Sequence, residues 1–385
     1  MYKRKITLSI TKSQSCFLWG PRQTGKSTLL NNTFPDALYY DLLLASDFRR
    51  LLHDPGILRQ ECEAQDLTGA TQTAPVIIDE VQKLPELLDE VQWLIVNRGL
   101  RFVLCGSSAR KLKRGGGNLL GGRAVRLELH PLTWSEISDF SLERALNHGL
   151  LPRHYQADDP RPLLHAYVGD YLREEIYAES LVRNLSSFQR FLDVAALANG
   201  EIVNYATIAR EVGVSAPTVR GYFEILTDTL LGIFVPAFQK RAKRRIVQAP
   251  KFYLFDVGVV NELTHQSQVM PGSMLFGKAF EQFILQELRA HASYTGRRYP
   301  LAYWRTSSGF EVDFVLAQGM VAVEVKSSAN PTADHLKGIR AFKEEFRAHR
   351  YLVVSLVAQA RRTEDGIEIL PWQDFLTQLW EGRVV

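Results

Sequence analysis

Residues 20–27 read GPRQTGKS and follow the short apolar run at residues 16–19. This segment constrains the fold more than any other feature, because a strand must precede it and a helix must follow it. Its glycines let backbone N–H groups turn towards a phosphate, while Lys26 carries positive charge and Ser27 offers a hydroxyl to Mg²⁺. We therefore expect a phosphate-binding loop for a nucleoside triphosphate and Mg²⁺ made of Gly20, Pro21, Arg22, Gln23, Thr24, Gly25, Lys26, Ser27 and Thr28.

The length of 385 residues allows two or three domains, and a hydrophobic content of 46% excludes a disordered chain. The net charge of +4 is small, so any surface for nucleic acid must come from local clusters of basic residues. The three cysteines share no close spacing, which is typical of a reducing cytoplasm. The start of the chain is too polar for a signal sequence, and no stretch approaches a membrane span, so we expect a cytoplasmic protein without a membrane partner.

Four further strands are expected in a first domain at residues 1–165, namely 37–41, 74–80, 101–105 and 124–129. Strands that alternate with helices favour a parallel sheet. Asp79 ends an apolar strand, so its carboxylate should reach the Mg²⁺ beside Ser27. Glu80 follows and can orient or deprotonate the attacking water, which distinguishes a hydrolase from a kinase. The alternative for this pair is a solvated acidic strand end.

The strand at residues 101–105 leads into Gly106, Ser107 and Ser108. Either serine could bond the attacking water or the γ-phosphate, although serine is equally at home as a helix N-cap. A glycine-rich basic loop then ends at Arg123, just before the next strand. Arg123 could reach the γ-phosphate of a neighbouring subunit as an arginine finger, or it could be an ordinary surface residue.

These segments resemble the AAA-type ATPases, in particular a prokaryotic group with a C-terminal domain of unknown function. The resemblance covers nearly the whole chain and is carried by GPRQTGKST, IIDEVQK, CGSSARKLKRGGGNLLGGR and HPLTWSE. It implies a Walker A lysine at Lys26, Walker B carboxylates at Asp79 and Glu80, a sensor at Ser107 or Ser108, and a finger at Arg123. It also implies a homo-oligomer such as a hexameric ring. Arg173 is a candidate second sensor.

Residues 166–250 are expected to form a helical lid and a winged helix-turn-helix. A short helix closes at Gly213, and a second begins near Ser215 with apolar residues at helical spacing. A basic run at residues 240–245 lies between two apolar segments, as expected for a wing. Contact with DNA phosphates is the functional interpretation, and a protein-docking unit with solvated basic residues is the alternative. The DNA-binding candidates are Thr218, Arg220, Lys240, Arg241, Lys243, Arg244 and Arg245.

Residues 251–385 are expected to form an α/β domain with a hairpin that turns at residues 318–319. Alternation along a strand places Glu324 and Lys326 on one face, which Asp313 can join from the partner strand. Such a set can chelate Mg²⁺ and position a water against a phosphodiester. It resembles the PD-(D/E)XK nuclease fold, which implies that Asp313 and Glu324 bind metal, Lys326 assists the nucleophile and Glu281 completes the site. The residue before Asp313 is valine where that pattern has proline.

The expected fold is thus an α/β AAA-type P-loop domain, then a helical and winged-helix domain, and last an α/β nuclease-like domain. The order of motifs favours an oligomeric ATPase that acts on DNA and carries a Mg²⁺-dependent nuclease. A polar strand face can also bind without cutting. The alternatives are therefore an ATP-gated module that docks DNA or protein without cleavage, and a regulator in which ATP controls the winged helix.

Overall fold

The structure is a computed structural model that describes residues 2–108, 110, 112, 120–172, 185–240 and 244–385. It divides into two compact units. The first comprises residues 1–131 with 228–230, and the second comprises residues 132–227 with 231–385. The boundary expected at residue 165 falls inside the second unit.

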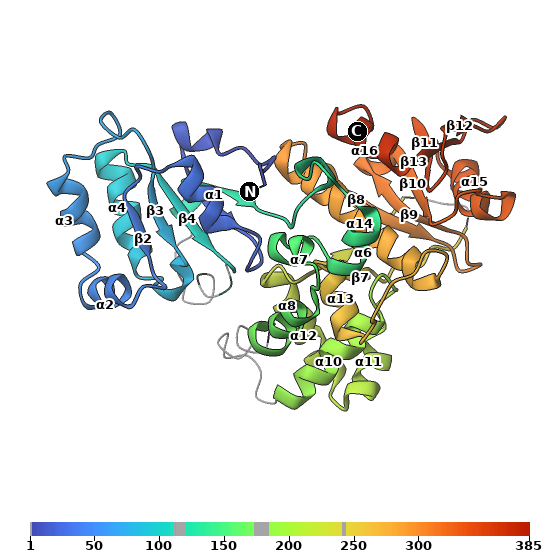
Figure 1. Ribbon diagram of the computed structural model, residues 1–385, viewed down its shortest axis with the longest axis horizontal. Coiled ribbons are helices and arrows are strands. Elements are labelled where there is room, and N and C mark those ends of the chain that lie inside the picture. The colour runs from blue at the N-terminus through green and yellow to red at the C-terminus, as the bar shows by residue number, and fades with distance from the viewer. Residues whose placement is uncertain (1, 109, 111, 113–119, 173–184, 241–243) are drawn as a thin grey trace. The chain divides into compact units, whose positions relative to one another are not determined.

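The first unit is built on a five-stranded parallel sheet in the order β2-β3-β4-β1-β5 (Figure 1). Its strands are β1 (Ser15–Trp19), β2 (Tyr39–Asp41), β3 (Val76–Asp79), β4 (Phe102–Gly106) and β5 (Ala124–Glu128). The expected parallel sheet is confirmed, because every described pairing within it is parallel. Both faces of β1, β3 and β4 are buried, which explains why these strands read as continuous apolar runs.

The helices of this unit are α1 (Lys26–Thr33), α2 (Ala45–His53), α3 (Ile57–Ala64) and α4 (Leu87–Arg98), with short turns η1 (Ser9–Lys12), η2 (Val81–Lys83) and η3 (Leu120–Gly122). The first turn of α1 follows directly from the glycine-rich loop. Strand β4 lies between β1 and β3, so it ends between the loop and Asp79. Its last residue must be small, since a Cβ on Gly106 would lie 2.2 Å from Gln82 Oε1 and 2.8 Å from the Trp19 ring.

The second unit begins with a helical part that surrounds a two-stranded antiparallel sheet, β6 (Gly232–Val235) with β7 (Lys251–Leu254). Its helices are α6 (Leu142–His148), α7 (Pro152–Gln156), α8 (Arg161–Ala166), α10 (Leu185–Leu197), α11 (Tyr205–Val212), α12 (Ala216–Asp228) and α13 (Val257–Leu263), with η4 (Trp134–Glu136) and the π-helix η5 (Tyr167–Leu172). Their shared core is rich in aromatic rings, among them Phe191, Phe223 and Phe252. Because β7 pairs with β6, the boundary expected at residue 250 separates two bonded strands.

A six-stranded mixed sheet completes the second unit in the order β12-β13-β11-β10-β9-β8. Its strands are β8 (Leu301–Arg305), β9 (Glu311–Leu316), β10 (Val321–Lys326), β11 (Arg350–Ser355), β12 (Arg361–Arg362) and β13 (Glu368–Pro371), and η6 (Ala317–Gly319) and η7 (Ala333–Leu336) are its short turns. The helices are α14 (Met274–Tyr294), α15 (Lys337–Glu345) and α16 (Trp372–Trp380). Figure 1 shows the sheet between α14 and α15.

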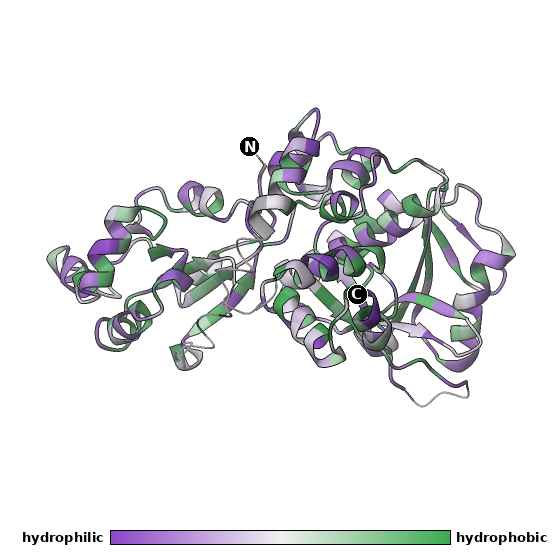
Figure 2. Cartoon of the chain, turned by 90° about the horizontal axis from the view of Figure 1, so that it is seen from below, coloured by the Kyte–Doolittle hydropathy of each residue, from purple (hydrophilic) through white to green (hydrophobic). Residues whose placement is uncertain are grey.

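The expected hairpin is confirmed, since β9 and β10 are antiparallel and joined through η6, with Gln318 at φ 59° and Gly319 at φ 95°. Many helices of the chain are hydrophilic on one side and hydrophobic on the other, as Figure 2 shows. This pattern is the physical reason that they cover sheets and core instead of standing free. Within the described residues, no helix is both long and apolar enough to cross a membrane.

Candidate functional site

The phosphate-binding loop is held in shape by glycines and by its own lysine. A Cβ on Gly20 would lie 2.4 Å from the Leu129 carbonyl oxygen, and Gly25 has φ +90°. The ammonium of Lys26 donates to the carbonyl oxygens of Gly20 at 2.7 Å and Pro21 at 3.0 Å. The Arg4 guanidinium donates to the Thr24 carbonyl at 2.6 Å and ties the loop to the start of the chain. Lys26 is therefore buried against the phosphate-binding loop to which it belongs.

Ser27 and Asp79 lie together, as the sequence predicts. The Ser27 hydroxyl donates to Asp79 Oδ2 at 2.6 Å. Ser27 lies in the first turn of α1 and Asp79 ends β3, although β4 lies between β3 and β1, the strand that leads into the loop. The Tyr39 hydroxyl donates to the same carboxylate oxygen at 2.6 Å. Burial and the Asp79 carboxylate raise the pKa of Tyr39, so the phenol remains a donor. A hydroxyl and a carboxylate are the hard oxygen ligands that Mg²⁺ prefers, so these residues fit that ion.

Glu80, Gln82 and Ser107 form one connected polar group beside Asp79. The Gln82 amide donates to Glu80 Oε2 and also to Ser107 Oγ, the latter at 3.1 Å. Glu80 has left-handed backbone angles (φ 58°, ψ 41°). Burial raises the pKa of the Glu80 carboxyl, and the positive charges of Lys26 and Arg22 oppose that rise. Sequence reasoning missed Tyr39, which lies inside the expected strand 37–41, and Gln82, which lies two residues after the expected strand 74–80.

The two serines after β4 have different surroundings. Ser107 Oγ accepts from Gln82 and so faces the group that contains Glu80. Ser108 Oγ accepts from the Arg110 N–H at 3.0 Å and donates to the Asp228 carbonyl at 3.3 Å. The Arg110 guanidinium pairs with the Asp228 carboxylate at 2.7 Å. The geometry thus favours Ser107 as the site residue and Ser108 as a structural residue.

Arg123 stands exposed between η3 and β5, where its guanidinium approaches the Leu120 carbonyl at 3.4 Å. Exposure leaves its side chain accessible to a second subunit, and the finger role stays a prediction. Gln23 and Thr28 are likewise exposed at the loop. Arg173, the candidate second sensor, lies outside the described residues.

Helices α11 and α12 form where the helix-turn-helix was expected. Asn204 caps the first helix through its side-chain oxygen, and Gly213 ends it at φ 76°. The predicted apolar face of α12 is buried against the aromatic core. On the outer side, Arg220 is exposed and lies 4.9 Å from the Tyr205 ring, while Thr218 is half-buried.

The run of basic residues expected to form a wing is partly packed against the sheet in the part that the structure describes. Between β6 and β7 the chain runs along strand β8, where the Phe238 N–H donates to the Tyr303 carbonyl at 2.6 Å. The Phe238 ring packs on Phe342 of α15, so burial of apolar surface holds this segment against the sheet. Arg244 bonds Glu345 at 3.0 Å and is therefore not an exposed phosphate contact.

Of the remaining basic candidates, Lys240 and Arg245 are exposed. Arg241 and Lys243 lie outside the described residues. Among the described residues of this run, Lys240 and Arg245 are therefore the ones that can contact phosphates.

The four residues proposed for the nuclease-like site do converge. Asp313 on β9, Glu324 and Lys326 on β10 and Glu281 on α14 line one cavity of about 260 Å³. The Lys326 ammonium contacts Glu324 Oε1 at 2.5 Å, and Asp313 Oδ2 accepts from the Val325 N–H at 2.8 Å. The predicted shared strand face is therefore confirmed.

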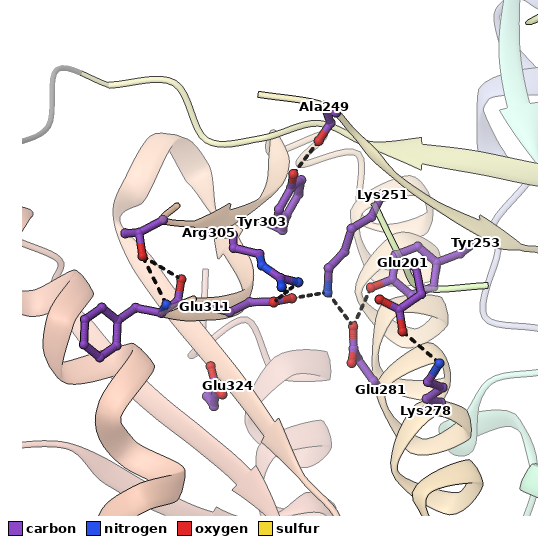
Figure 3. Close-up of polar contacts among 12 residues, drawn as sticks. Glu201, Ala249, Lys251, Tyr253, Lys278, Glu281, Tyr303, Arg305, Glu311 and Glu324 are labelled. Atoms are coloured by element: carbon purple, nitrogen blue, oxygen red, sulfur yellow. Dashed lines mark hydrogen bonds and ion pairs between the residues drawn. The ribbon is translucent and has the colours of Figure 1, made fainter. Parts of the chain in front are cut away.

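Burial dominates the electrostatics of this cavity. It raises the pKa of Glu324 to about 7 against the opposing charge of Lys326. Burial and the neighbouring carboxylates raise the pKa of Asp313 well above its usual range. Sequence reasoning missed Lys251 and Glu311, which line the same cavity and pair at 2.5 Å (Figure 3). Across the described residues, no group of three or more His, Cys, Asp or Glu side chains is arranged to hold a metal ion. The Lys326 ammonium pairs with Glu324, one of the two carboxylates expected to bind Mg²⁺, so the cavity as it stands does not fit that ion.

Three protein families match successive parts of the chain. Residues 12–138 match the family described as an AAA domain. Residues 139–269 match a Domain of unknown function (DUF8612), and residues 276–375 match a Domain of unknown function (DUF4143). The first of these matches agrees with the parallel sheet and the loop geometry, so this part of the chain is an AAA-type P-loop domain.

Two relatives that match most of this chain are described as uncharacterized proteins. One from Mycobacterium tuberculosis is 24% identical over 387 residues, which cover 97% of this chain and 83% of that protein. One from Haemophilus influenzae is 22% identical, covering 93% of both chains. Among solved structures, a signal transduction ATPase with numerous domains and a tetratricopeptide repeat sensor, from Pyrococcus horikoshii, is 15% identical with a TM-score of 0.24. That match covers 77% of this chain, which spans about half (48%) of the archaeal one.

Proposed function

We propose that the first unit binds ATP with Mg²⁺ and hydrolyses it. The observation that carries this proposal is the direct contact of Ser27 with Asp79 at 2.6 Å, next to the connected group of Glu80, Gln82 and Ser107. A magnesium ligand pair and a base for the attacking water thus stand at one edge of one sheet.

Each residue has a distinct part in this chemistry. Lys26 exchanges the loop carbonyls for the β- and γ-phosphate oxygens of ATP. Ser27 and Asp79 hold Mg²⁺, which neutralises charge on the phosphates when it is bound. Glu80 orients the attacking water and accepts its proton. Gln82 donates to both the Glu80 carboxylate and the Ser107 hydroxyl and so fixes their positions. The attacking water can then contact both groups.

Two substitutions test this assignment. Lys26→Ala should weaken ATP binding, and Glu80→Gln should bind ATP but slow turnover by roughly 10²–10⁴-fold, the typical contribution of a positioned base. Lys12→Ala is the matched control, because it removes an exposed lysine of the same unit. ATP binding followed by titration and phosphate release by a coupled assay supply the readouts. Hydrolysis at the wild-type rate in either site variant contradicts the proposal.

We also propose that Arg123 completes this site on a neighbouring subunit of a homo-oligomer. Its exposure at the start of β5 supports the idea, and an arginine finger contributes about 10³-fold or more to turnover. Native mass measurement with and without ATP, combined with Arg123→Ala, tests it. A monomer under both conditions with undiminished turnover contradicts the role.

For the second unit we propose an ATP-gated module that binds DNA or protein without cleaving it. The cavity carboxylates are paired with lysines, and this favours binding of DNA or protein over metal-dependent cleavage. The helix-turn-helix, read as a winged helix with exposed Arg220 and Arg245, is the proposed DNA contact.

A cleavage assay decides between binding without cleavage and a metal-dependent nuclease. Purified protein with Mn²⁺ or Mg²⁺ and ATP should leave DNA and RNA intact. Nicking that Asp313→Ala abolishes would contradict the binding proposal and establish the nuclease. Weak, salt-independent DNA affinity would favour a protein partner instead.

A further inference from the structure

A lysine from outside the nuclease-like sheet forms ion pairs with two carboxylates of the cavity. Lys251 opens strand β7, which pairs with β6 of the helical part. Its ammonium lies 2.5 Å from Glu311 Oε1 and 3.2 Å from Glu281 Oε1 (Figure 3). The Lys251 side chain is only 4% exposed, so this cation is held inside the protein.

Four acidic residues, here called the carboxylate cluster, surround this ammonium and that of Lys326. They are Glu281, Glu311, Asp313 and Glu324. The Tyr253 hydroxyl donates to Glu281, and the Arg305 guanidinium donates to Glu311 Oε2 at 3.0 Å. Four carboxylates therefore meet two ammonium groups and one guanidinium. Carboxylates buried this closely are stable only when cations or hydrogen-bond donors compensate them.

An ammonium and a divalent metal compete for the same oxygens. Mg²⁺ and Mn²⁺ prefer carboxylate oxygens, and two cations a few ångström apart in a buried site repel each other strongly. One acceptor is still available, because Glu324 Oε2 is buried and has no hydrogen-bond partner among the described residues. This oxygen is a ligand that a metal ion can bind. The positive charge of Lys251 opposes such binding, because it already compensates part of the negative charge of the cluster.

We propose that Lys251 is the resident cation of the carboxylate cluster and keeps divalent metals out of it. The nuclease-like domain thereby retains four clustered carboxylates, while the Lys251 ammonium pairs with two of them, Glu281 and Glu311. Because Lys251 belongs to the strand pair that follows the helix-turn-helix, its position depends on the helical part of the unit. The charge of the cavity is thus set by a segment outside its own sheet.

Mn²⁺ binding to the full chain without nucleotide, followed by electron paramagnetic resonance of free Mn²⁺, tests this directly. Lys251→Met should add one Mn²⁺ site whose affinity is at least about tenfold higher than any wild-type affinity at the cluster, which corresponds to about 1.4 kcal/mol. Adding Glu324→Gln to that variant should abolish the new site and separate it from binding at the phosphate loop. Lys278→Met is the matched control, since Lys278 lines the same cavity but pairs with the half-exposed Glu201.

The absence of an added site in a folded Lys251→Met variant would overturn the proposal. The wild-type chain provides a second test that does not depend on folding of the variant. A wild-type Mn²⁺ site of affinity better than about 0.1 mM that Glu324→Gln removes would also overturn it, because that is the range of a functional cation site. ATPase activity is measured separately, so neither result bears on the first unit.

Discussion

The different surroundings of Ser107 and Ser108 lead to opposite predictions for two adjacent alanine substitutions. Ser107→Ala removes the oxygen that accepts from Gln82 at 3.1 Å, and within the described residues the Gln82 amide then keeps its contact with Glu80. A neutral hydrogen bond contributes about 1 kcal/mol, and a buried donor that loses its partner costs about 1–3 kcal/mol. If that loss falls on the position of Glu80 and its water, turnover should fall by about 10–100-fold.

Ser108→Ala removes the acceptor of the Arg110 N–H, which is part of the chain path after β4. We expect it to lower the free energy of unfolding by about 1 kcal/mol and to leave turnover within about twofold of wild type. Phosphate release at saturating Mg²⁺ and ATP measures the first effect, and urea unfolding measures the second. Equal losses of turnover in both variants, or undiminished turnover in Ser107→Ala, would refute the assignment.

Three further outcomes follow from other parts of the chain. Glu287 accepts hydrogen bonds from the Trp134 N–H and the Trp380 indole, and burial raises the pKa of its carboxyl to about 8. Between the ordinary pKa of a glutamate and this raised pKa, the folded protein keeps a proton on Glu287 that the unfolded chain has lost. The free energy of unfolding should therefore fall as pH rises from about 5 to about 8, and Glu287→Gln should reduce this fall in urea unfolding; equal slopes would contradict it. Gly106→Ala should lower the free energy of unfolding by about 1–3 kcal/mol through contact with Gln82 and Trp19, and a melting temperature equal to wild type would show that the strand end can relax. Arg245→Ala should reduce the salt dependence of DNA affinity while Arg244→Ala does not, because Arg244 is bound to Glu345; a larger effect of Arg244→Ala would contradict this assignment.

Local patterns predicted the elements well because their causes are local. The glycines and lysine of the loop, the apolar run that ends at Asp79 and Gly213 at the end of α11 each act within a few residues. Alternation along a strand likewise predicts that Glu324 and Lys326 share one face, and the contact between them agrees. The Ser27–Asp79 contact was predictable as well, because parallel strands end at a common edge.

The contacts that local patterns did not predict join residues far apart in the chain. The spacing of basic residues favoured a wing, yet Phe238 and Arg244 bind α15 about one hundred residues later. No local pattern marks Gln82 as the link between Glu80 and Ser107, since its second partner follows 25 residues on. Such pairings depend on how strands and helices pack, which composition and periodicity do not report.

The sequence by itself determined that this chain contains a phosphate-binding loop with a carboxylate pair at a strand end, a helix-turn-helix, and a strand with acidic and basic residues on one face. These follow from backbone geometry and from the period of side chains along helices and strands. Only the tertiary structure decided which serine meets Glu80 and which cation meets the carboxylate cluster. The reason is that charge compensation in a buried site depends on every group within a few ångström, and Lys251 reaches Glu311 from 60 residues away in sequence.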